Sequence, residues 1–560
     1  MPAVCSKNGR ILFILIVLLA ISMSQASAQS NPLDRKTGRS IVRAEQGMVA
    51  TSQPLATQAG LEVLRHGGNA VDAAIAVAAV LNVTEPMMTG VGGDMFAIVY
   101  WAQDGKLHAL SASGRAPKAL TPEYFAQHGM KQVPVRGMEP ITVPGAFDGW
   151  TTLLGRYGTR NMSELLQPAI HYAEQGYPVM EKASEDWEEV VDVLKRDPSA
   201  ASTYLVNGEA PKPGEVFKNP HLAATLRQLA SGGREAYYNG PIGRAIVDYC
   251  QKHGGFLTME DLAAQHAEWV DPISTTYRGY TVYEMPPNNQ GLTVLIALNI
   301  LEGFNLAAMK SEPDRYYHTL IEAMKLAFAD RNRYIADPKF AKVPVAELLS
   351  KDYAAKRRAL IKPDAVLQNP PPGLDAAQSE TTYFTIVDKD HNAVSFINSL
   401  YEHFGSGIVA GDTGIVLHDR GAGFSLDPKS PNLIAPGKRP FHTLIPAMVT
   451  KDGKLFMSFG VMGGDMQAQG HVQVLTNMID LGMDLQHAIE TPRFRYVSGS
   501  RVYLEPEMGK DVIDKLAARG HQPLTPRRNQ MGGGQAILVE RNGTLAGGSD
   551  IRKDGMALGY

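Results

Sequence analysis

The sequence predicts a layered α+β fold, and an αββα core is the specific form it favours. Apolar residues recur with helical spacing through most of the middle of the chain, about residues 145–350. From residue 381 onward, short β-branched and aromatic runs separated by turn residues dominate, with further helical segments among them. Helix runs and strand runs in one chain bury their apolar faces against each other, which favours stacked layers.

The first 28 residues are predicted to be a Sec signal peptide. Lys7 and Arg10 precede the apolar stretch 11–23, which is too short to span a bilayer comfortably. Ala26 and Ala28 then fit the small-x-small cleavage pattern. An uncleaved anchor is the alternative. Cleavage would leave a periplasmic or secreted protein with no stable membrane anchor.

Composition excludes several kinds of function. The 560-residue chain has a formal net charge of −3 and no basic run, so there is no electrostatic case for binding nucleic acid. Removal of residues 1–28 leaves Cys250 as the single cysteine, which excludes an intramolecular disulfide and a cysteine zinc site. The sequence has no Walker A, HExxH or GxSxG pattern.

The first elements of the mature chain are predicted to be two helices and a strand. Apolar spacing gives a helix from about residue 54 that stops at Gly67 and Gly68, and Asn69 caps a second helix. The glycine turn 90–93 then enters the strand 94–101. A dinucleotide-binding fingerprint needs the opposite order, with glycines leaving a strand and opening a helix, so these glycines are interpreted as packing residues.

Residues 381–387 and 393–401 are predicted to form a β-hairpin around the polar turn 388–392. Antiparallel pairing centred near Asp390 places Thr381 opposite Ser399. A threonine hydroxyl needs a nearby base, and a free α-amino group with a pKa near 7.7–8.0 can serve. Cleavage of the Glu380–Thr381 bond, at the end of the Pro-rich linker 361–380, would create that amine. The other interpretation is an ordinary strand start.

Gly463 and Gly464 are candidate oxyanion-hole residues. They lie between a predicted strand and a predicted helix. Consecutive N–H groups without side chains at a helix N-terminus allow close approach of a developing oxyanion. The other interpretation is a turn without chemistry.

Several segments resemble the γ-glutamyltransferase (glutathione hydrolase) family, in order, over about residues 45–555. The segments that carry the resemblance include SETTYFTIVD, FGSGIVAGDTGIVL, GKRPFHTLIPAM and GVMGGDMQAQGHVQV. The resemblance implies an αββα sandwich of the N-terminal nucleophile hydrolase type, formed by two subunits cut from one precursor. These would be a large, helix-rich subunit, 29–380, and a small catalytic subunit, 381–560, held as a heterodimer.

The resemblance also implies residue roles. Thr381 falls on the family's nucleophile, Ser399 on its supporting hydroxyl, and Gly463 and Gly464 on its oxyanion-hole pair. No cofactor and no metal are implied. The substrate-binding positions of the family fall on Arg115, Tyr401, Arg420, Gly423, His442 and Thr443.

The substrate-binding positions depart from the usual pattern. Typical members hold the glutamyl ammonium with acidic or amide side chains, and the α-carboxylate with an arginine and a Ser-Ser pair. Here Gly423 stands at the acidic position and Arg420 beside it, while His442 and Thr443 replace the serines. Arg420 supplies a partner for a carboxylate rather than an ammonium. This pattern resembles the subfamily of class IV cephalosporin acylases and oxamate amidohydrolases.

Three hypotheses follow for function. The first is an exported γ-glutamyltransferase or glutathione hydrolase that passes the acyl group of γ-glutamyl amides to water or an amine. The second is an amidase or acylase acting on dicarboxylic monoamides such as glutaryl, cephalosporin-type or oxamate-like compounds. The third is a non-catalytic binding protein of the same fold.

Overall fold

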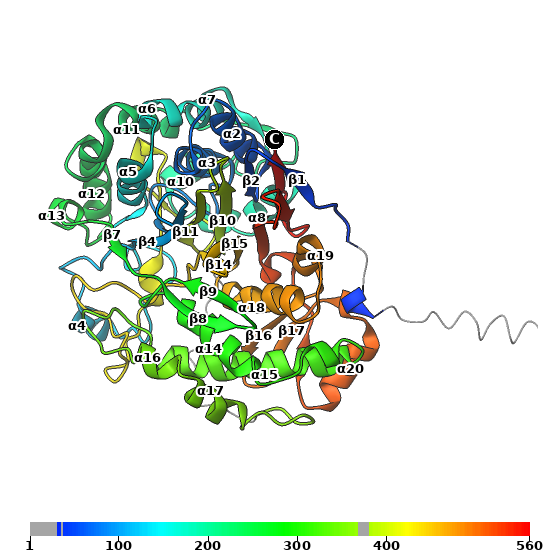
Figure 1. Cartoon of the computed structure of the whole chain (residues 1–560). Helices are drawn as coiled ribbons and strands as arrows, with labels where there is room; N and C mark the ends of the chain where they lie inside the picture. Colours follow the sequence, from blue (N-terminus) through cyan, green and yellow to red (C-terminus); the bar gives the residue numbers. More distant parts are fainter. Residues whose placement is uncertain (1–30, 35–36, 368–379) are drawn as a thin grey trace, which may run out of the picture.

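The computed structural model describes residues 31–34, 37–367 and 380–560 of a mixed α and β protein. Figure 1 shows its strands in the middle of the molecule, with one group of helices above them and another below. The predicted signal peptide, 1–28, and most of the predicted linker, 368–379, lie outside the described residues. No helix in the described ranges is long and apolar enough to cross a bilayer.

Most of the strands form two seven-stranded sheets. The first sheet has the order β1-β20-β19-β15-β14-β9-β8, and the second has the order β21-β2-β10-β11-β3-β4-β7. Strands of the first sheet are β1 (Val42–Ala44), β20 (Leu545–Ser549), β19 (Gly533–Val539), β15 (Lys454–Met462), β14 (Ala447–Lys451), β9 (Tyr280–Glu284) and β8 (Ile273–Tyr277). Strands of the second are β21 (Met556–Gly559), β2 (Met48–Thr51), β10 (Glu380–Val387), β11 (Ala393–Tyr401), β3 (Asp94–Trp101), β4 (Lys106–Ala112) and β7 (Glu268–Val270).

The alternation of side chains along the strands explains how the sheets are layered. Phe96 and Ile98 of β3 belong to a buried apolar cluster that also contains Met448 of β14 and Ile537 of β19, so this cluster joins the two sheets. Ala97, between the first two, belongs instead to the cluster shared with helices α2, α3 and α5. Successive side chains on a strand point to opposite faces, so each sheet is covered on both sides.

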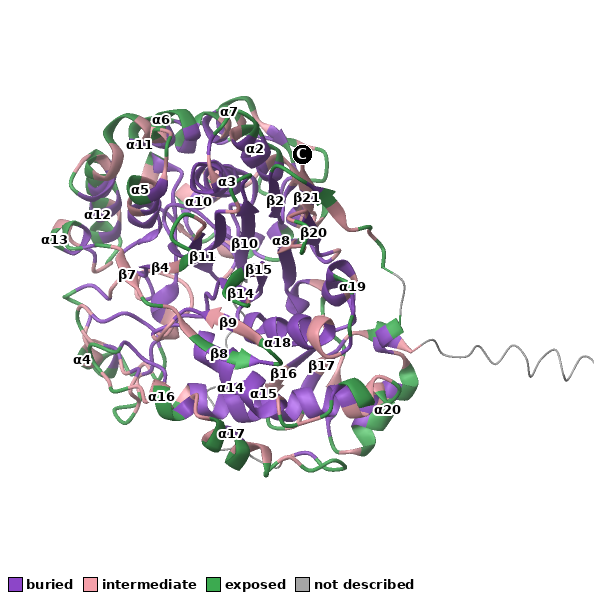
Figure 2. Cartoon of the chain, viewed as in Figure 1, coloured by how far each residue is buried: buried purple, intermediate pink, exposed green. Residues whose placement is uncertain are grey.

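Helices pack on the outer face of each sheet. On the second sheet lie α2 (Pro54–Arg65), α3 (Ala70–Thr84) and α5 (Ala146–Tyr157), and α7 (Gln167–Gln175) and α11 (Pro220–Tyr238) pack against these helices. On the first sheet lie α14 (Gly291–Leu301), α18 (Met466–Ile479) and α19 (Leu485–Glu490), and α15 (Pro313–Tyr334) packs against α14. Figure 2 shows α14, α15 and α18 as mostly buried, whereas α20 (Lys510–Ala518) is largely exposed.

Smaller elements complete the described chain. The other α-helices are α4 (Pro122–Gln127), α6 (Met162–Leu165), α8 (Glu181–Glu188), α9 (Val191–Leu194), α10 (Pro198–Tyr204), α12 (Pro241–Lys252), α13 (Met259–Ala263), α16 (Val345–Leu348) and α17 (Lys351–Arg358). The other strands are β5 (Tyr177–Pro178), β6 (Val216–Phe217), β12 (Ile408–Val409), β13 (Val416–Leu417), β16 (Phe494–Ser498), β17 (Arg501–Leu504) and β18 (Gln522–Leu524).

The predicted helix pair near the start of the chain is confirmed. The Asn69 side chain accepts from the N–H groups of Val71 and Asp72, and Asp72 accepts from the Asn69 N–H, which completes a capping box. Gln53 caps α2 in a similar way. Asn69, at the start of the second helix, was identified from sequence because capping is a local property of the chain.

Strands before residue 380 were underpredicted. The first sheet takes β1, β8 and β9 from this part of the chain, and the second takes β2, β3, β4 and β7. As a result, strands from before and after the predicted cleavage point pair with each other: β2 lies between β21 and β10, and β1 pairs with β20. β1, β7, β8 and β9 are short and partly exposed, and most have a partner far along the sequence, so local patterning carries little signal for them.

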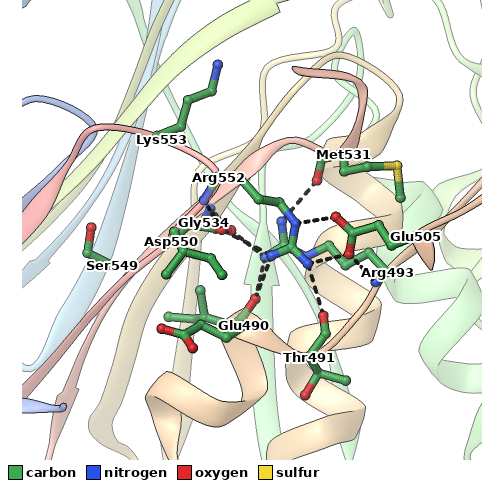
Figure 3. Close-up of polar contacts among 12 residues, drawn as sticks. Glu490, Thr491, Arg493, Glu505, Met531, Gly534, Ser549, Asp550, Arg552 and Lys553 are labelled. Atoms are coloured by element: carbon green, nitrogen blue, oxygen red, sulfur yellow. Dashed lines mark hydrogen bonds and ion pairs between the residues drawn. The ribbon is translucent and has the colours of Figure 1, made fainter. Parts of the chain in front are cut away.

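A buried ionic cluster fixes the end of β20 beside the start of β19 (Figure 3). Arg552 donates to Glu505 at 2.7 Å and to Asp550 at 3.0 Å, and Arg493 lies 2.8 Å from Asp550. Burial alone would raise the pKa of the Asp550 carboxyl, but the two guanidinium groups and neighbouring N–H groups bring it down to about 2. Asp550 also accepts from the N–H of Gly534, which pairs with the strand leading into the Gly463 turn.

Candidate active site

The predicted hairpin forms with the predicted register. β10 and β11 are antiparallel, with Thr382 opposite Asn398 and Glu380 opposite Tyr401. The pairing is irregular between Glu380 and Thr382, so Thr381 lies at a local break in the ladder. Its Oγ1 donates to Ser399 Oγ at 3.4 Å, and both side chains are fully buried.

Ser399 is the point where several donors meet. Besides Thr381, the Tyr401 N–H donates to its Oγ at 2.8 Å and the Arg420 Nη2 at 3.3 Å. These contacts fix the hydroxyl of Ser399 and, through it, the side chain of Thr381. A hydroxyl held in this way can orient a nucleophile.

Gln467 also contacts Thr381, and sequence reasoning missed it. Its Nε2 donates to Thr381 Oγ1 at 3.4 Å, while its Oε1 accepts from the Ile445 N–H at 3.0 Å. Gln467 lies in the first turn of α18, three residues after Gly464. Its position just after a glycine pair that opens a helix is the signal that could have identified it.

Gly463 and Gly464 form the predicted turn between a strand and a helix. β15 ends at Met462 and α18 begins at Met466. The two glycines have φ angles of +111° and +56°, a region that L side chains seldom adopt. Within the described residues, neither N–H group has a hydrogen-bond acceptor. Two such donors can stabilise a tetrahedral oxyanion.

Arg420 is a buried cation without a close carboxylate. Its Nη1 donates to Thr443 Oγ1 at 3.0 Å, and its guanidinium lies 4.1 Å from the centroid of the Tyr401 ring. In the described part of the chain, Nε has no acceptor, and no carboxylate oxygen lies within 4.0 Å. Burial lowers the pKa of Arg420, although Tyr401 and acidic neighbours oppose this shift. Such a site favours an anionic ligand.

Tyr401 has an unusual backbone conformation. Its φ is +87°, which is rare for a bulky residue, and its side chain is buried. The conformation directs its N–H at Ser399 while its ring lies against Arg420. Backbone strain of this kind often accompanies a functional site.

His442 is engaged by the protein on both ring nitrogens. Nε2 lies 3.0 Å from Asp94 Oδ2, and Nδ1 accepts from the Leu444 N–H at 3.3 Å. Burial lowers its pKa to about 3, so the ring is neutral. These contacts are those of a packed, hydrogen-bonded histidine, and a direct role for His442 in binding substrate stays a prediction.

Gly423 lies on the same short turn as Arg420. A Cβ at Gly423 would lie 3.0 Å from the Phe441 carbonyl oxygen, so a larger residue there needs an adjustment of the backbone. Its role in substrate binding stays a prediction.

Arg115 lies in a separate ion-pair cluster. Its guanidinium donates to Glu268 at 3.1 Å and to the Gly437 carbonyl at 3.2 Å. Among the described residues, no contact joins it to the group around Thr381. The structure therefore brings together Thr381, Ser399, Tyr401, Arg420 and Thr443, and leaves the predicted role of Arg115 untested.

Within the part of the chain that the structure describes, one group of potential metal ligands lies away from this site. His318, Glu322 and His521 offer ligand atoms within 4.8 Å of one another. The Lys325 ammonium lies 3.0 Å from Glu322 and already balances its charge, and His318 hydrogen-bonds His521 at 2.8 Å. These contacts suit a polar anchor between α15 and the loop after α20 better than a cation site.

Comparisons with known proteins give matches over most of the chain. The family model described as gamma-glutamyltranspeptidase matches residues 56–560. A protein of Bacillus subtilis (strain 168), "Glutathione hydrolase-like YwrD proenzyme", is 40% identical and is aligned over 93% of this chain and 99% of its own length. The "Acylase ACY 1 proenzyme" of Pseudomonas sp. (strain V22) is 37% identical over 91% of this chain and 93% of its own.

A solved structure is similar over nearly the whole fold. The cephalosporin acylase from Bacillus halodurans superposes with a TM-score of 0.89 and 44% sequence identity. The match covers 94% of this chain and 98% of that one.

Proposed function

From the premise that this chain belongs to the gamma-glutamyltranspeptidase family, we propose that it is a self-processing amide hydrolase whose nucleophile is Thr381. The proposal includes the αββα sandwich of the N-terminal nucleophile hydrolases, with a large subunit, 29–380, and a small catalytic subunit, 381–560. It also includes export to the periplasm or beyond after removal of residues 1–28. Relatives named as proenzymes support the processing step.

Self-cleavage begins with attack of Thr381 Oγ1 on the carbonyl carbon of Glu380. The Oγ–C bond forms and the C–N bond between the two residues breaks, while the nitrogen of Thr381 takes up a proton. Water then hydrolyses the resulting ester, which leaves a carboxylate on Glu380 and a free α-amine on Thr381. The 3.4 Å contact with Ser399 supports the orientation of Oγ1 for this attack.

In the processed enzyme the α-amine of Thr381 is the general base for its own hydroxyl. Its ordinary pKa, near 7.7–8.0, suits proton transfer at neutral pH. Attack on a substrate amide gives a tetrahedral oxyanion, which the N–H groups of Gly463 and Gly464 stabilise. Loss of the amine leaves an acyl-enzyme, and water or an acceptor amine then releases the acyl group.

Arg420 carries the proposal for substrate class. A buried guanidinium next to Ser399 and Thr443, whose Nε has no acceptor among the described residues, favours an acyl group that ends in a carboxylate. Dicarboxylic monoamides fit this description. Relatives and a structural neighbour named as acylases and as an oxamate amidohydrolase support it.

A γ-glutamyl amide is the second candidate substrate. It also carries a carboxylate, and a relative named "Glutathione hydrolase proenzyme" is 33% identical to this chain, while one named glutathione hydrolase-like is 40% identical. Its α-ammonium needs an acidic or amide partner, and Gly423 and Arg420 stand where typical members supply one. This substitution favours the first candidate.

The test compares p-nitroaniline release from glutaryl- and γ-glutamyl-p-nitroanilide, which differ only in the α-amino group. We expect the glutaryl compound to be preferred and the Thr381→Ala variant to be inactive and uncleaved on a denaturing gel. A preference for the γ-glutamyl compound would establish the second candidate. An active Thr381→Ala variant would overturn the nucleophile assignment, and a wild-type chain that stays uncut and inactive would support the non-catalytic alternative.

A further inference from the structure

Gln290 touches both loops that carry the proposed site. It stands at the N-cap position of α14, where its side chain makes no capping hydrogen bond, in the part of the chain before the predicted cleavage point. Its Nε2 donates to the Thr443 carbonyl at 2.8 Å and to the Gly464 carbonyl at 3.0 Å. Thr443 is the residue whose hydroxyl holds Arg420, and Gly464 belongs to the glycine pair. One buried amide thus links the candidate anion site to the candidate oxyanion hole.

Arg331 fixes the orientation of the Gln290 amide. The Arg331 Nη1 donates to Gln290 Oε1 at 2.9 Å, so the oxygen faces the guanidinium and both amide hydrogens face the loop carbonyls. The same guanidinium donates to Asp465 at 2.5 Å and 3.4 Å. All three side chains are buried, so each polar contact is shielded from water.

The glycine pair needs support of this kind. Glycine has no side chain to restrict its backbone, and both residues have positive φ angles. The Gly463 carbonyl is held by the Met466 N–H at 2.9 Å, inside the turn itself. The Gly464 carbonyl accepts from the Gln467 N–H at 3.1 Å and from Gln290 Nε2 at 3.0 Å. Arg331 donates to the carboxylate of Asp465, the residue after Gly464. The Gln290 and Arg331 contacts come from the part of the chain before the cleavage point.

We propose that Gln290, oriented by Arg331 and its partner Asp465, is a positioning residue that sets the geometry of the Gly463–Gly464 donors. The inference rests on the proposed function, because it assigns those donors to the oxyanion. It adds a role for the large subunit in catalysis, since both Gln290 and Arg331 belong to that subunit. Neither side chain touches the proposed nucleophile, so both act through the loop.

The chain offers a matched control in Gln473. This residue lies on α18, two turns after the glycine pair, and is also buried. Its Nε2 donates to the carbonyls of Gln469 and Phe494, both at 3.1 Å, and its Oε1 accepts from the Phe494 N–H. Gln473 therefore makes the same number of hydrogen bonds as Gln290, but not to the proposed site.

The experiment compares Gln290→Glu with Gln473→Glu in the full-length chain. Each change keeps the side-chain shape but replaces the amide nitrogen, which has two N–H donors, with a carboxylate oxygen that faces carbonyl oxygens. Self-cleavage is followed on a denaturing gel, steady-state kinetics are measured with glutaryl-p-nitroanilide, and the unfolding midpoint is measured in urea. We expect Gln290→Glu to slow self-cleavage and to lower kcat by about 100-fold, with KM changed by less than about threefold, because a misplaced oxyanion donor mainly affects the transition state.

Gln473→Glu should lower the unfolding midpoint by a similar amount while leaving the cleavage rate and kcat within about threefold of wild type. If Gln290→Glu does not fold, Gln290→Met, which lacks the donors but adds no charge, replaces it with the same kinetic expectation. Equal kinetic effects at positions 290 and 473 would overturn the inference, as would a change confined to KM. The Thr381→Ala variant separates the two proposals. If Thr381→Ala remains active, the proposed function fails. If Thr381→Ala is inactive but Gln290→Glu is fully active, only the positioning role of Gln290 is overturned.

Discussion

Replacement of Arg420 by glutamine gives the most direct test of the candidate anion site. The side chain of Arg420 is fully buried and bonds two hydroxyl groups, and within the described residues no carboxylate lies close to it. Arg420→Gln removes the charge but retains a polar group. The variant should therefore fail to attract a carboxylate, and it also loses the guanidinium contact with Ser399.

The expected magnitude follows from the contacts. A hydrogen bond to a charged group contributes about 1.5–3 kcal/mol, so loss of one such contact to the substrate lowers kcat/KM roughly 10- to 150-fold. The free protein loses only two bonds to neutral hydroxyls and is relieved of a buried charge. Its unfolding free energy should therefore change by about 1 kcal/mol or less.

The assay uses two donors of similar length, glutaryl- and pentanoyl-p-nitroanilide, of which only the first carries a carboxylate. Arg420→Gln should lower kcat/KM for the glutaryl donor about 10- to 150-fold more than for the pentanoyl donor, whose smaller loss follows from the lost contact with Ser399. An equal loss for both donors would refute the reasoning, since it would mean that Arg420 supports the site through packing. Urea unfolding of the variant serves as the control for folding.

Three other substitutions test neighbouring features. Gly463→Ala adds a Cβ at a φ of +111°, where it would lie 2.9 Å from the backbone of the loop before β19, so kcat should fall at least about 100-fold. The control is Gly482→Ala, at a φ of +67° with open space around it, which should leave kcat unchanged in the same assay. Tyr401→Asn removes the ring beside Arg420, so KM for the glutaryl donor should rise. Asparagine tolerates positive φ better than tyrosine, so the unfolding midpoint should stay near wild type. An unchanged KM would contradict the role of the ring. Burial lowers the pKa of His442 to about 3, so its contribution to stability is complete above the unfolded pKa near 6.5 and is lost as pH falls toward 3, by about 1.4 kcal/mol per pH unit. His442→Gln should reduce the slope of unfolding free energy against pH, measured in urea between pH 6.5 and 4.5. Because the contributions of separate groups add, an unchanged slope would contradict the lowered pKa of His442.

The hairpin and the glycine turn could be predicted from sequence because each depends on local patterning. Thr381 and Ser399 were paired by counting along two alternating strands, and the structure has the same register for Thr382 and Asn398. Gly463 and Gly464 were recognised because a strand, two glycines and a helix follow one another directly. These features need no knowledge of distant parts of the chain.

The contacts that come from distant segments could not be predicted. Gln290 and Gly464 are 174 positions apart, and no local pattern distinguishes Gln290 from other polar residues at a helix start. The positive φ of Tyr401 is likewise imposed by tertiary contacts with Ser399 and Arg420. Arg115 shows the converse problem: its place in a motif does not reveal that its guanidinium is already paired with Glu268.

The interleaving of strands from before and after residue 380 has a consequence for folding. β2 lies between β21 and β10, and β1 pairs with β20, so both sheets combine strands from before and after residue 380. Once the chain is cut, unfolding yields two molecules instead of one, so re-formation depends on protein concentration. The processed protein would then stay folded because it unfolds slowly, and not because it refolds readily. Efficient assembly would be possible only once, before the chain is cut.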